Sequence, residues 1–526
     1  MRPQSQVSPC APLFSPAVAV VLCLLPGLAA AQVSVTTWHY DNLRDGQNTQ
    51  ETILTTSNVN SKTFGKLFSC SVDAGIYGQP LYLPGVSIAG GTHNVVYVVT
   101  ENNSVYAFDA DGLVTTPLWH VNLSAAGESP ASCATISDIC KSIQVPIGIT
   151  STPVIDPTSN TIYVLALTEE TGGAYVDRLH ALDVTTGAEK FGGPVQIQAT
   201  VAGTGAGSVG GRITFDASHQ LQRPGLLLLN GTLYLAWGAL AQQQPWHGWV
   251  MAYNPATLAQ TAVYNDTANG SMGGIWESGG GLSADSAGNI YLQTGDGTFD
   301  ANTGGVDYGD SFLKLSGGLA VLDYFTPYNQ QLFWEDDLDV GGGAGVVLPR
   351  QNGSYPDEIV GADKQGNIYL VNRDDMGGYN PLLDGNIQTV TGSLDGYTNS
   401  PAYWNGAVYF GGNNDYLSRY TLKSGLLSTA PVSKSPNILI QGSTPSISSN
   451  GTANGIVWVI DVGASLTKAC VLRAYSATNL AKQLYNSSQA GRRDTPGDGV
   501  VFTTPTVANG KVYIGTFNQL DVYGLF

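Results

Sequence analysis

Short hydrophobic stretches, each with an aromatic residue near its centre, recur along the whole chain. They read NVVYVV, NTIYVL, GTLYLA, GNIYLQ, GNIYLV, GAVYFG, GIVWVI and GKVYIG. Their central aromatic residues are Tyr97, Tyr163, Tyr234, Tyr291, Tyr369, Tyr409, Trp458 and Tyr513. β-Branched and aromatic residues that are entered through Gly or Asn predict a strand that follows a turn. Eight strands of one kind are therefore predicted.

Most of these stretches have similar neighbours. A strand that opens near a proline precedes them, as in QPLYLPG at 79–85 and TPTVANG at 504–510. A second type of strand follows them, as in VYAFDADG at 105–112, and then a fourth, such as PLWHVNL at 117–123. Four antiparallel strands in a repeating unit are typical of a propeller blade. The predicted blades span about residues 79–123, 152–199, 222–268, 273–329, 341–392, 397–436, 443–490 and 503–526.

The last predicted blade is incomplete, because only three strands remain before the chain ends at Phe526. The missing strand is available in FGKLFSCSVDA at 64–74, and its pairing with the last blade would remove two exposed sheet edges. We therefore predict an all-β fold, in which residues 32–526 form one eight-bladed β-propeller. The stretch around Tyr369 is the least regular and leaves open another strand position in its blade. Seven blades is the main competing count, and a β-sandwich is disfavoured because it gives no reason for repeated units.

The first 31 residues read as a signal peptide. Arg2 supplies a positive start, Ala17 to Leu28 is mostly apolar, and Ala29 to Ala31 are small residues suited to cleavage before Gln32. The apolar run is too short to span a bilayer comfortably. We expect export to the periplasm or the medium, with no membrane span.

Charge and cysteine content narrow the possibilities further. The formal net charge of −18 excludes a nucleic-acid partner, because a phosphate backbone needs a basic surface. Cys133 and Cys140 close a short polar loop and are predicted to form a disulfide in an oxidising compartment. A second bridge between Cys70 and Cys470 is left open, since a closed ring brings the two ends of the chain together. No CxxCH haem attachment motif is present.

The VYAFDADG and LWHVNL segments resemble the repeats of the quinoprotein alcohol dehydrogenase superfamily, whose enzymes bind pyrroloquinoline quinone (PQQ). The same repeats occur in non-enzymatic relatives such as the outer-membrane assembly lipoprotein BamB. VDYGDSFLKL at 306–315 and DYFTP at 323–327 are similar to segments of secreted PQQ-repeat proteins of environmental bacteria. The resemblance covers essentially the whole chain after residue 31, but a fold alone does not assign an activity.

The resemblance implies positions for a quinone site near the propeller axis. Trp276 falls where the family has the tryptophan beneath the cofactor, and Lys364 matches the cation beside the quinone oxygens. Asp296 falls on a metal-ligand turn, in place of asparagine, where a carboxylate oxygen suits calcium. Asp337 and Asp339 follow roughly where the aspartate that acts as general base would lie.

Two departures count against a working enzyme. The metal-binding glutamate of the family would fall near Gln243 or Gln244, which are uncharged, and the adjacent Cys-Cys pair above the quinone is absent. Each matching residue also has a structural interpretation. Trp276 is equally a packed aromatic residue, and aspartate or lysine in a glycine turn is common without any function.

We therefore expect a secreted binding or scaffold propeller with a degenerate quinone site. Its ligand would be a protein or a carbohydrate on a loop face or at the central channel, with no cofactor. The alternative is a PQQ- and calcium-dependent dehydrogenase of alcohols or sugars. A polysaccharide hydrolase or lyase with paired carboxylates is a third interpretation. Convergence of Trp276, Asp296, Lys364 and the 336–339 segment on the axis would favour the enzyme.

Overall fold

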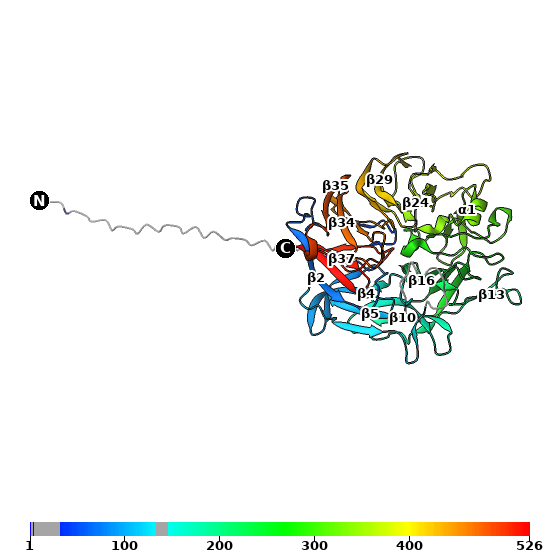
Figure 1. Cartoon of the computed structure of the whole chain (residues 1–526), viewed down its shortest axis with the longest axis horizontal. Coiled ribbons are helices and arrows are strands. Elements are labelled where there is room, and N and C mark those ends of the chain that lie inside the picture. Colours follow the sequence, from blue (N-terminus) through cyan, green and yellow to red (C-terminus); the bar gives the residue numbers. More distant parts are fainter. Residues whose placement is uncertain (2–3, 5–31, 133–145) are drawn as a thin grey trace. The chain divides into compact units, whose positions relative to one another are not determined.

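Eight antiparallel sheets of four or more strands follow one another along the chain. The computed structural model describes residues 1, 4, 32–132 and 146–526, and residues 33–526 form one compact unit. Within this unit the sheets follow a ring in chain order, from blue to red in Figure 1. The eight-bladed propeller that the aromatic repeat predicts is confirmed, and the competing count of seven is wrong.

In the first seven blades the four main strands follow chain order, and in the eighth a strand from the N-terminal side takes the fourth position, so each blade is an antiparallel meander. The first blade comprises β3 (Leu81–Ile88), β4 (Gly91–Val99), β5 (Ser104–Asp109) and β6 (Trp119–Asn122). The second comprises β8 (Val154–Asp156), β9 (Thr161–Glu169), β10 (Tyr175–Asp183) and β11 (Val195–Gln196), with β7 (Ser129–Pro130) beside β9. The third comprises β15 (Leu227–Leu229), β16 (Thr232–Ala239), β17 (Trp249–Tyr253) and β18 (Gln260–Asn265), with β14 (Gln220–Leu221) beside β16. The fourth comprises β19 (Ser283–Ala284), β20 (Ile290–Gln293), β21 (Phe312–Leu315) and β22 (Val321–Phe325).

The remaining blades repeat this order. The fifth comprises β23 (Val346–Val347), β24 (Glu358–Ala362), β25 (Ile368–Asn372) and β26 (Gln388–Val390). The sixth comprises β27 (Ala402–Trp404), β28 (Ala407–Gly411), β29 (Asp415–Lys423) and β31 (Ser433–Leu439), with β30 (Leu426–Leu427) beside β29. The seventh comprises β32 (Ser446–Asn450), β33 (Ala453–Asp461), β34 (Val471–Ser476) and β35 (Asn479–Asn486), with β1 (Gln47–Asn48) beside β32. The eighth comprises β36 (Thr506–Ala508), β37 (Lys511–Gly515), β38 (Gln519–Leu525) and β2 (Phe64–Ser71).

The described residues outside the blades include few regular elements. One hairpin, β12 (Thr200–Ala202) with β13 (Arg212–Thr214), forms its own two-stranded sheet. One α-helix, α1 (Gln330–Asp336), lies between the fourth and fifth blades. The short 3-10 helices are η3 (Glu277–Gly279), η4 (Ala301–Thr303), η5 (Val340–Gly342) and η6 (Gly491–Arg493).

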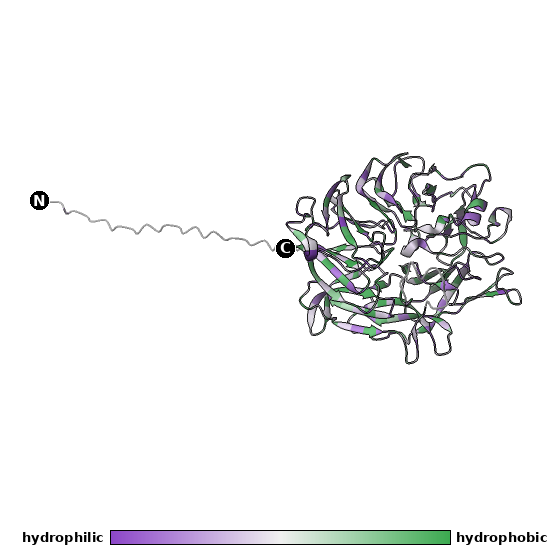
Figure 2. Ribbon diagram, viewed as in Figure 1, coloured by the Kyte–Doolittle hydropathy of each residue, from purple (hydrophilic) through white to green (hydrophobic). Residues whose placement is uncertain are grey.

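The aromatic repeat has a physical basis in contacts between neighbouring blades. The central aromatic residues are at most 3% exposed, and most lie in the second strand of a blade. Tyr369 lies instead in the third strand, β25, which is the alternative position that its irregular sequence surroundings had left open. Five tyrosine hydroxyls donate to a backbone carbonyl of the next blade: Tyr97 to Val184, Tyr163 to Pro255, Tyr234 to Gly317, Tyr409 to Ala477 and Tyr513 to Ala110. Both hydrophobic and hydrophilic residues occur along the strands of the ring (Figure 2).

The ring closes between the two ends of the propeller. The N-terminal strand β2 pairs antiparallel with the C-terminal strand β38, so that Phe64 lies opposite Leu525. The Phe64 ring is fully buried, 5.4 Å from the ring of Trp458 and 4.9 Å from that of Tyr485. The predicted closing strand is confirmed. Its burial between the seventh and eighth blades makes the closure part of the hydrophobic core.

An N-terminal segment, residues 35–48, bonds to all eight blades. Its hydrogen-bond partners lie on the innermost strand of each blade: Tyr82, Ile155, Leu228, Ala284, Val347, Tyr403, Ile447 and Val507. We call residues 35–48 the axial segment. The sequence pattern predicts no such segment, because it contains no repeat and no long hydrophobic run.

Arg44 anchors the axial segment. Its side chain is fully buried and donates hydrogen bonds of 2.6 to 3.3 Å to five oxygen atoms. The acceptors are the Thr37 hydroxyl and the carbonyls of Trp38, Asp41, Leu226 and Leu282. Burial lowers the pKa of the guanidinium to about 10, so Arg44 stays charged at neutral pH. Hydrogen bonds to a charged group are among the stronger ones in proteins.

The cysteine predictions have different outcomes. Cys133 and Cys140 lie outside the described residues, as do residues 5–31 of the expected signal peptide. Cys70 and Cys470 are both buried free thiols, so the bridge that was left open does not form. Cys70 packs with Leu520 and Val522, whereas Cys470 packs with the cluster that contains Tyr523. The two thiols therefore face opposite sides of β38. No helix in the described part of the chain is long and apolar enough to cross a bilayer.

Candidate functional site

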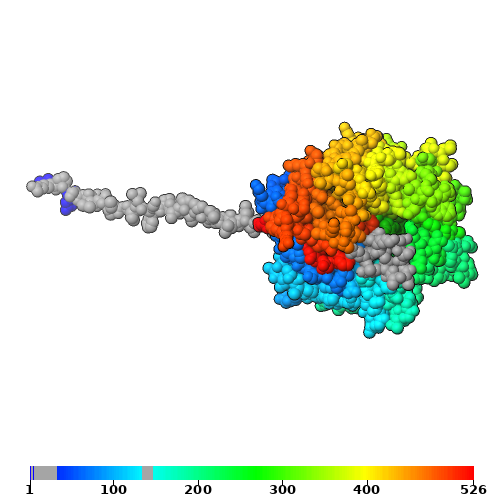
Figure 3. Space-filling model, in the orientation of Figure 1, coloured from blue at the N-terminus to red at the C-terminus, as the bar shows by residue number. Residues whose placement is uncertain are grey.

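A pocket of about 190 Å³ lies among connections that share one face of the propeller. Its lining residues are Ala239, Gln242, Trp246, Gly273, Gly274, Trp276, Gly295, Asp296, Asp339, Lys364 and Thr398. Ala239 ends the second strand of blade three, and the others follow the second strand of a blade or precede the first strand of the next blade. In an antiparallel meander these two kinds of connection emerge on the same side. In Figure 3 the surface is hollowed near the middle of the face, beside residues coloured green.

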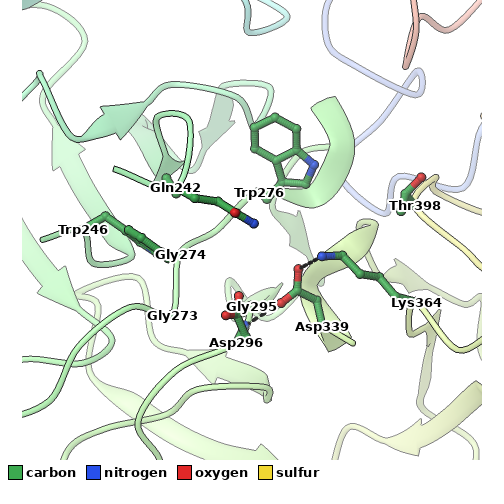
Figure 4. Close-up of a pocket in the computed structure, with 11 residues that line it drawn as sticks. Gln242, Trp246, Gly273, Gly274, Trp276, Gly295, Asp296, Asp339, Lys364 and Thr398 are labelled. Carbon is green, nitrogen blue, oxygen red and sulfur yellow. Dashed lines mark hydrogen bonds and ion pairs between the residues drawn. The ribbon is translucent and has the colours of Figure 1, made fainter. Parts of the chain in front are cut away.

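The structure brings together most of the residues that the sequence singles out. Trp276, Asp296, Asp339 and Lys364 all line this pocket, which we call the axial pocket (Figure 4). Asp337 joins them from the end of α1, because its carboxylate lies 2.5 Å from the Lys364 ammonium. These residues therefore lie around one pocket. The roles that the resemblance implies for these residues stay predictions.

Glycine residues fix the turn that carries Asp296. The amide of Gly273 donates to the carbonyl of Asp296, and the amide of Gly295 donates to that of Gly274. A Cβ atom at Gly297 would lie 2.3 Å from the nitrogen of Gly273, so this close approach requires glycine. The backbone of blade four thus lies directly against the connection that carries Trp276.

Lys364 links two of the aspartates. Its Nζ atom lies 2.5 Å from Asp337 Oδ1 and 2.6 Å from Asp339 Oδ2. Asp339 Oδ1 accepts a 2.6 Å hydrogen bond from the backbone amide of Asp296. Carboxylate oxygens of Asp296, Asp337 and Asp339 all lie within 4.8 Å of one another. One ammonium therefore faces three carboxylates.

This crowding separates the pKa values of the aspartates. Burial, and then the charge of Asp339, raises the pKa of Asp296 to about 9. Burial opposes the ionisation of Asp339, but the Lys364 ammonium outweighs it and lowers the pKa of Asp339 below its ordinary value. Two carboxyl groups whose environments separate their pKa values in this way are a common feature of functional sites.

Asp310 lies behind this cluster. Its side chain is fully buried, and one oxygen accepts a 3.2 Å hydrogen bond from Gln330 Nε2. The other oxygen, Oδ1, has no hydrogen-bond partner in the part of the chain that the structure describes. Burial, and then the charge of Asp339, raises the pKa of Asp310 well above its ordinary value. An unpaired buried carboxylate oxygen is costly unless a ligand, an ion or water satisfies it.

An aromatic cage that the sequence does not reveal holds Trp276. The guanidinium of the buried Arg223 lies 5.8 Å from the ring of Trp276 and 5.3 Å from that of Phe502. Phe502 meets Trp276 edge to face at 6.2 Å, and Tyr77 lies 5.8 Å from the same guanidinium. These groups come from distant parts of the chain, so no local motif signals them. Together they fix the orientation of the Trp276 indole.

Two further residues of the β16–β17 connection differ in their relation to the axial pocket. The uncharged glutamine at the pocket is Gln242, whose Nε2 lies 3.5 Å from Asp337 Oδ2, rather than Gln243 or Gln244. His247, between two tryptophans, is 3% exposed and both ring nitrogens have partners, Thr267 and the Ala206 carbonyl. This histidine packs the loop and does not line the pocket.

The propeller resembles several solved structures whose sequences share little identity with it. A europium-containing methanol dehydrogenase shares 12% identity at a TM-score of 0.60, over 94% of this chain and 98% of that one. The quinohemoprotein alcohol dehydrogenase of Comamonas testosteroni shares 13% identity at a TM-score of 0.58, over 94% of this chain and 80% of that one. BamB of Moraxella catarrhalis shares 11% identity at a TM-score of 0.51, over 88% of this chain and 99% of that one. No family model and no curated protein matches the sequence.

The fold is that of the quinoprotein dehydrogenases and of BamB. Identities this low show the fold and do not assign an activity. These structural neighbours include dehydrogenases as well as BamB, so the fold does not distinguish a binding protein from an enzyme. Any distinction has to come from the residues of the site.

The axial pocket suits a hard cation better than it suits PQQ. Three clustered carboxylates supply the oxygen ligands that such cations prefer. PQQ is a planar quinone that itself carries three carboxylate groups, and these need cationic partners. Among the described lining residues the only cation is Lys364, and Asp337 and Asp339 already neutralise it. The residues present therefore fit a cation and fit the quinone poorly.

Proposed function

We propose that this chain is an exported binding propeller whose axial pocket holds a hard metal cation together with a small polar ligand. The observation that carries the proposal is the cluster of Asp296, Asp337 and Asp339, whose oxygens lie within 4.8 Å of one another. The unpartnered Oδ1 of the buried Asp310 lies behind it. A bound cation would offset the burial, and then the repulsion from Asp339, that keep Asp296 protonated at neutral pH.

The remaining walls of the axial pocket suit an uncharged ligand. Trp246 and Trp276 offer aromatic surface, and glycine residues offer backbone groups without side chains in the way. A ligand with adjacent oxygen atoms, such as a carbohydrate diol, would coordinate the cation with its oxygens and pack its carbon atoms on the tryptophans. The cavity of about 190 Å³ limits this ligand to one small group, such as a single sugar ring or the end of a longer chain.

A terbium titration tests the cation site. Terbium is a hard trivalent cation whose emission is sensitised by a nearby tryptophan, so binding should produce saturable luminescence that calcium reverses. Asp296→Asn should weaken binding by about tenfold or more, because it removes a charged ligand. Asp415→Asn is the matched control, since Asp415 lies on blade six and pairs with Lys434. Equal luminescence in the wild type and Asp296→Asn would reject the site.

A quinoprotein-type dehydrogenase is the second candidate. The convergence of Trp276, Asp296, Asp339 and Lys364 on one pocket favours it. It would need the cation to offset the aspartates before the quinone could enter. Loading with PQQ and calcium, followed by dye reduction with a panel of alcohols and sugars, separates the two candidates. Dye reduction that disappears in Trp276→Ala would establish the enzyme, and cation binding without PQQ uptake would establish the binding protein.

A further inference from the structure

A second cavity, of about 490 Å³, lies on the face of the propeller opposite the axial pocket. Part of its wall comes from the β19–β20 and β23–β24 turns, which follow the first strands of blades four and five. In an antiparallel meander these turns emerge on the side opposite the connections that follow second strands. Six of its lining residues are charged: Asp285, Lys314, Arg350, Asp357, Arg373 and Asp374. We call it the Lys314 cavity.

Four of these charged groups bind one another. The guanidinium of Arg373, a residue that is 8% exposed, lies 3.0 Å from Asp285 Oδ2 and 3.2 Å from Asp357 Oδ1. Its Nε atom donates a 3.2 Å hydrogen bond to the carbonyl of Glu358. Arg350 pairs with the other carboxylate oxygen of Asp357. Two guanidinium groups and two carboxylates therefore neutralise each other.

Hydrogen bonds hold Asp285 in this network. Its Oδ1 atom accepts 3.0 Å bonds from the amides of Ala287 and Asn289, and its Oδ2 atom accepts a 2.8 Å bond from the Tyr291 hydroxyl. Burial opposes the ionisation of Asp285, but its hydrogen bonds, those from Asn289 first, outweigh burial and lower its pKa below the ordinary value. Asp285 therefore stays charged at neutral pH, and the wall that it forms with Arg373 is a fixed part of the fold.

Lys314 and Asp374 are not part of this network. Lys314 is half-buried, its Nζ atom donates a 2.6 Å hydrogen bond to the Arg373 carbonyl, and it forms no ion pair with the residues that the structure describes. Asp374 is exposed, and its carboxylate has no partner in the same part of the chain. Because Arg373 directly precedes Asp374, the Lys314 ammonium lies beside the backbone of Asp374. Among its described residues the cavity thus offers one unpaired cation and one unpaired anion.

This arrangement selects the charge of a ligand. An anion would be attracted by Lys314 and repelled by Asp374, and for a cation the two effects are reversed. A zwitterion meets an opposite charge at both of its ends. Leu43, Leu348 and Pro349 add apolar surface to the same cavity. Its volume lies in the range of about 300 to 1,000 Å³ that is typical of small-molecule sites.

We propose that the Lys314 cavity binds a free α-amino acid with an aliphatic side chain. The carboxylate of the amino acid would accept from the Lys314 ammonium, and its own ammonium would donate to the Asp374 carboxylate. Its side chain would pack on Leu43 and Pro349. This site is independent of the axial pocket and of any metal cation.

Binding can be measured on the purified protein by calorimetry and saturation-transfer NMR with EDTA present. The main probe is leucine, and glycine lacks its side chain. Isovalerate lacks the ammonium of leucine, and isopentylamine lacks the carboxylate. We expect leucine to saturate the protein with a dissociation constant of about 1 mM or lower. The two singly charged probes should bind about tenfold more weakly, because each loses one charged hydrogen bond. Glycine should also bind more weakly than leucine, since it buries no side chain.

Two variants test the two charges separately. Lys314→Met should weaken leucine binding by about tenfold, because the partner of the carboxylate is lost. The matched control is Lys434→Met, which changes a lysine that pairs with Asp415 on blade six and should leave leucine binding unchanged. Asp374→Asn should weaken leucine binding but strengthen isovalerate binding, because it removes the repulsion of an anion.

Asp374 is exposed, so Asp374→Asn keeps the test decisive even if Lys314→Met does not fold. The proposal is overturned if leucine does not saturate, or if it binds no tighter than isovalerate or isopentylamine. It is also overturned if either folded variant binds leucine as the wild type does. EDTA keeps cations out of the axial pocket, so failure of the proposed cation site would not affect any of these outcomes.

Discussion

Lys364 occupies the two carboxylates that a bound cation would need, so its replacement by glutamine should strengthen cation binding. Its ammonium lies 2.5 Å from Asp337 and 2.6 Å from Asp339. In Lys364→Gln both aspartates are freed, the side chain keeps a polar end, and the pocket gains one net negative charge. The same substitution would weaken a site in which Lys364 served to hold an anionic ligand.

The expected size follows from Coulomb's law. A unit charge about 5 Å from a cation costs roughly 3 kcal/mol at an effective dielectric constant of about 20. The Lys364 side chain is 25% exposed and can turn toward solvent when a cation enters, so screening lowers this cost. A gain of about 1.4 kcal/mol, equivalent to a tenfold tighter dissociation constant, is the expected result.

Terbium luminescence measures the effect directly, because Trp246 and Trp276 line the same pocket and can sensitise the emission. Lys434→Gln is the matched control, since that lysine lies 3.6 Å from Asp415 on another blade and should leave the affinity unchanged. Circular dichroism establishes that both variants fold. A Lys364→Gln protein that binds terbium with unchanged or weaker affinity would refute the competition argument.

Three further predictions concern stability. Arg44→Met removes the donor to five oxygens, most of them buried, and should lower the free energy of unfolding by about 3 kcal/mol in a denaturant titration. The same change at the exposed Arg350 should leave this free energy unchanged. Phe64→Ala opens a cavity at the ring closure and should lower the free energy of unfolding by about 3 to 5 kcal/mol. The control Leu67→Ala changes an exposed side chain and should lower it by less than about 1 kcal/mol. Similar denaturation midpoints for the two variants would contradict a contribution of Phe64 to the closure. Burial raises the pKa of Asp177 to about 8 in the folded protein, so between about pH 4 and 8 the folded state holds a proton that the unfolded state has lost. The free energy of unfolding should therefore fall as the pH rises through this range, by an amount on the order of 5 kcal/mol at most. Asp177→Asn should reduce this slope in thermal unfolding followed across that pH range, while Asp296 and other buried carboxyl groups with raised pKa values keep part of it. An equal slope in the variant would show that Asp177 does not contribute.

The fold could be predicted from the sequence because the repeat has a local cause. An aromatic residue in the second strand reaches the next blade, and in five blades its hydroxyl bonds to that blade directly, so the same residue type is needed at each turn of the ring. Tyr369 shows the limit of the pattern, because a third strand can carry the same letters. The axial segment escaped prediction for the opposite reason. It forms hydrogen bonds largely through backbone groups and through Arg44. Backbone hydrogen bonds need no particular side chains, so they produce no regular spacing of hydrophobic residues in the sequence.

The positions of the axial pocket were also foreseeable, although its electrostatics were not. Connections after second strands and before first strands share one face in any propeller, so Trp276, Asp296, Asp339 and Lys364 converge once the strands are assigned. The carboxylates that Lys364 pairs with depend on the directions of the side chains. The spacing of residues in the sequence does not determine these directions. The Arg223 cage around Trp276 is a similar case, because its members meet only through the closed ring.

The balance of charge in the axial pocket explains why the fold and the chemistry can diverge. The turn that carries Asp296 is fixed by backbone contacts of Gly273, Gly295 and Gly297, which would survive a change of side chain at position 296. Ring closure rests on Phe64 and the axial segment, which lie outside the pocket. Substitutions in the pocket therefore cost the propeller little stability while they change which ligand it accepts. A carboxylate at position 296 makes this pocket less suited to an anionic ligand and better suited to a cation than an amide would.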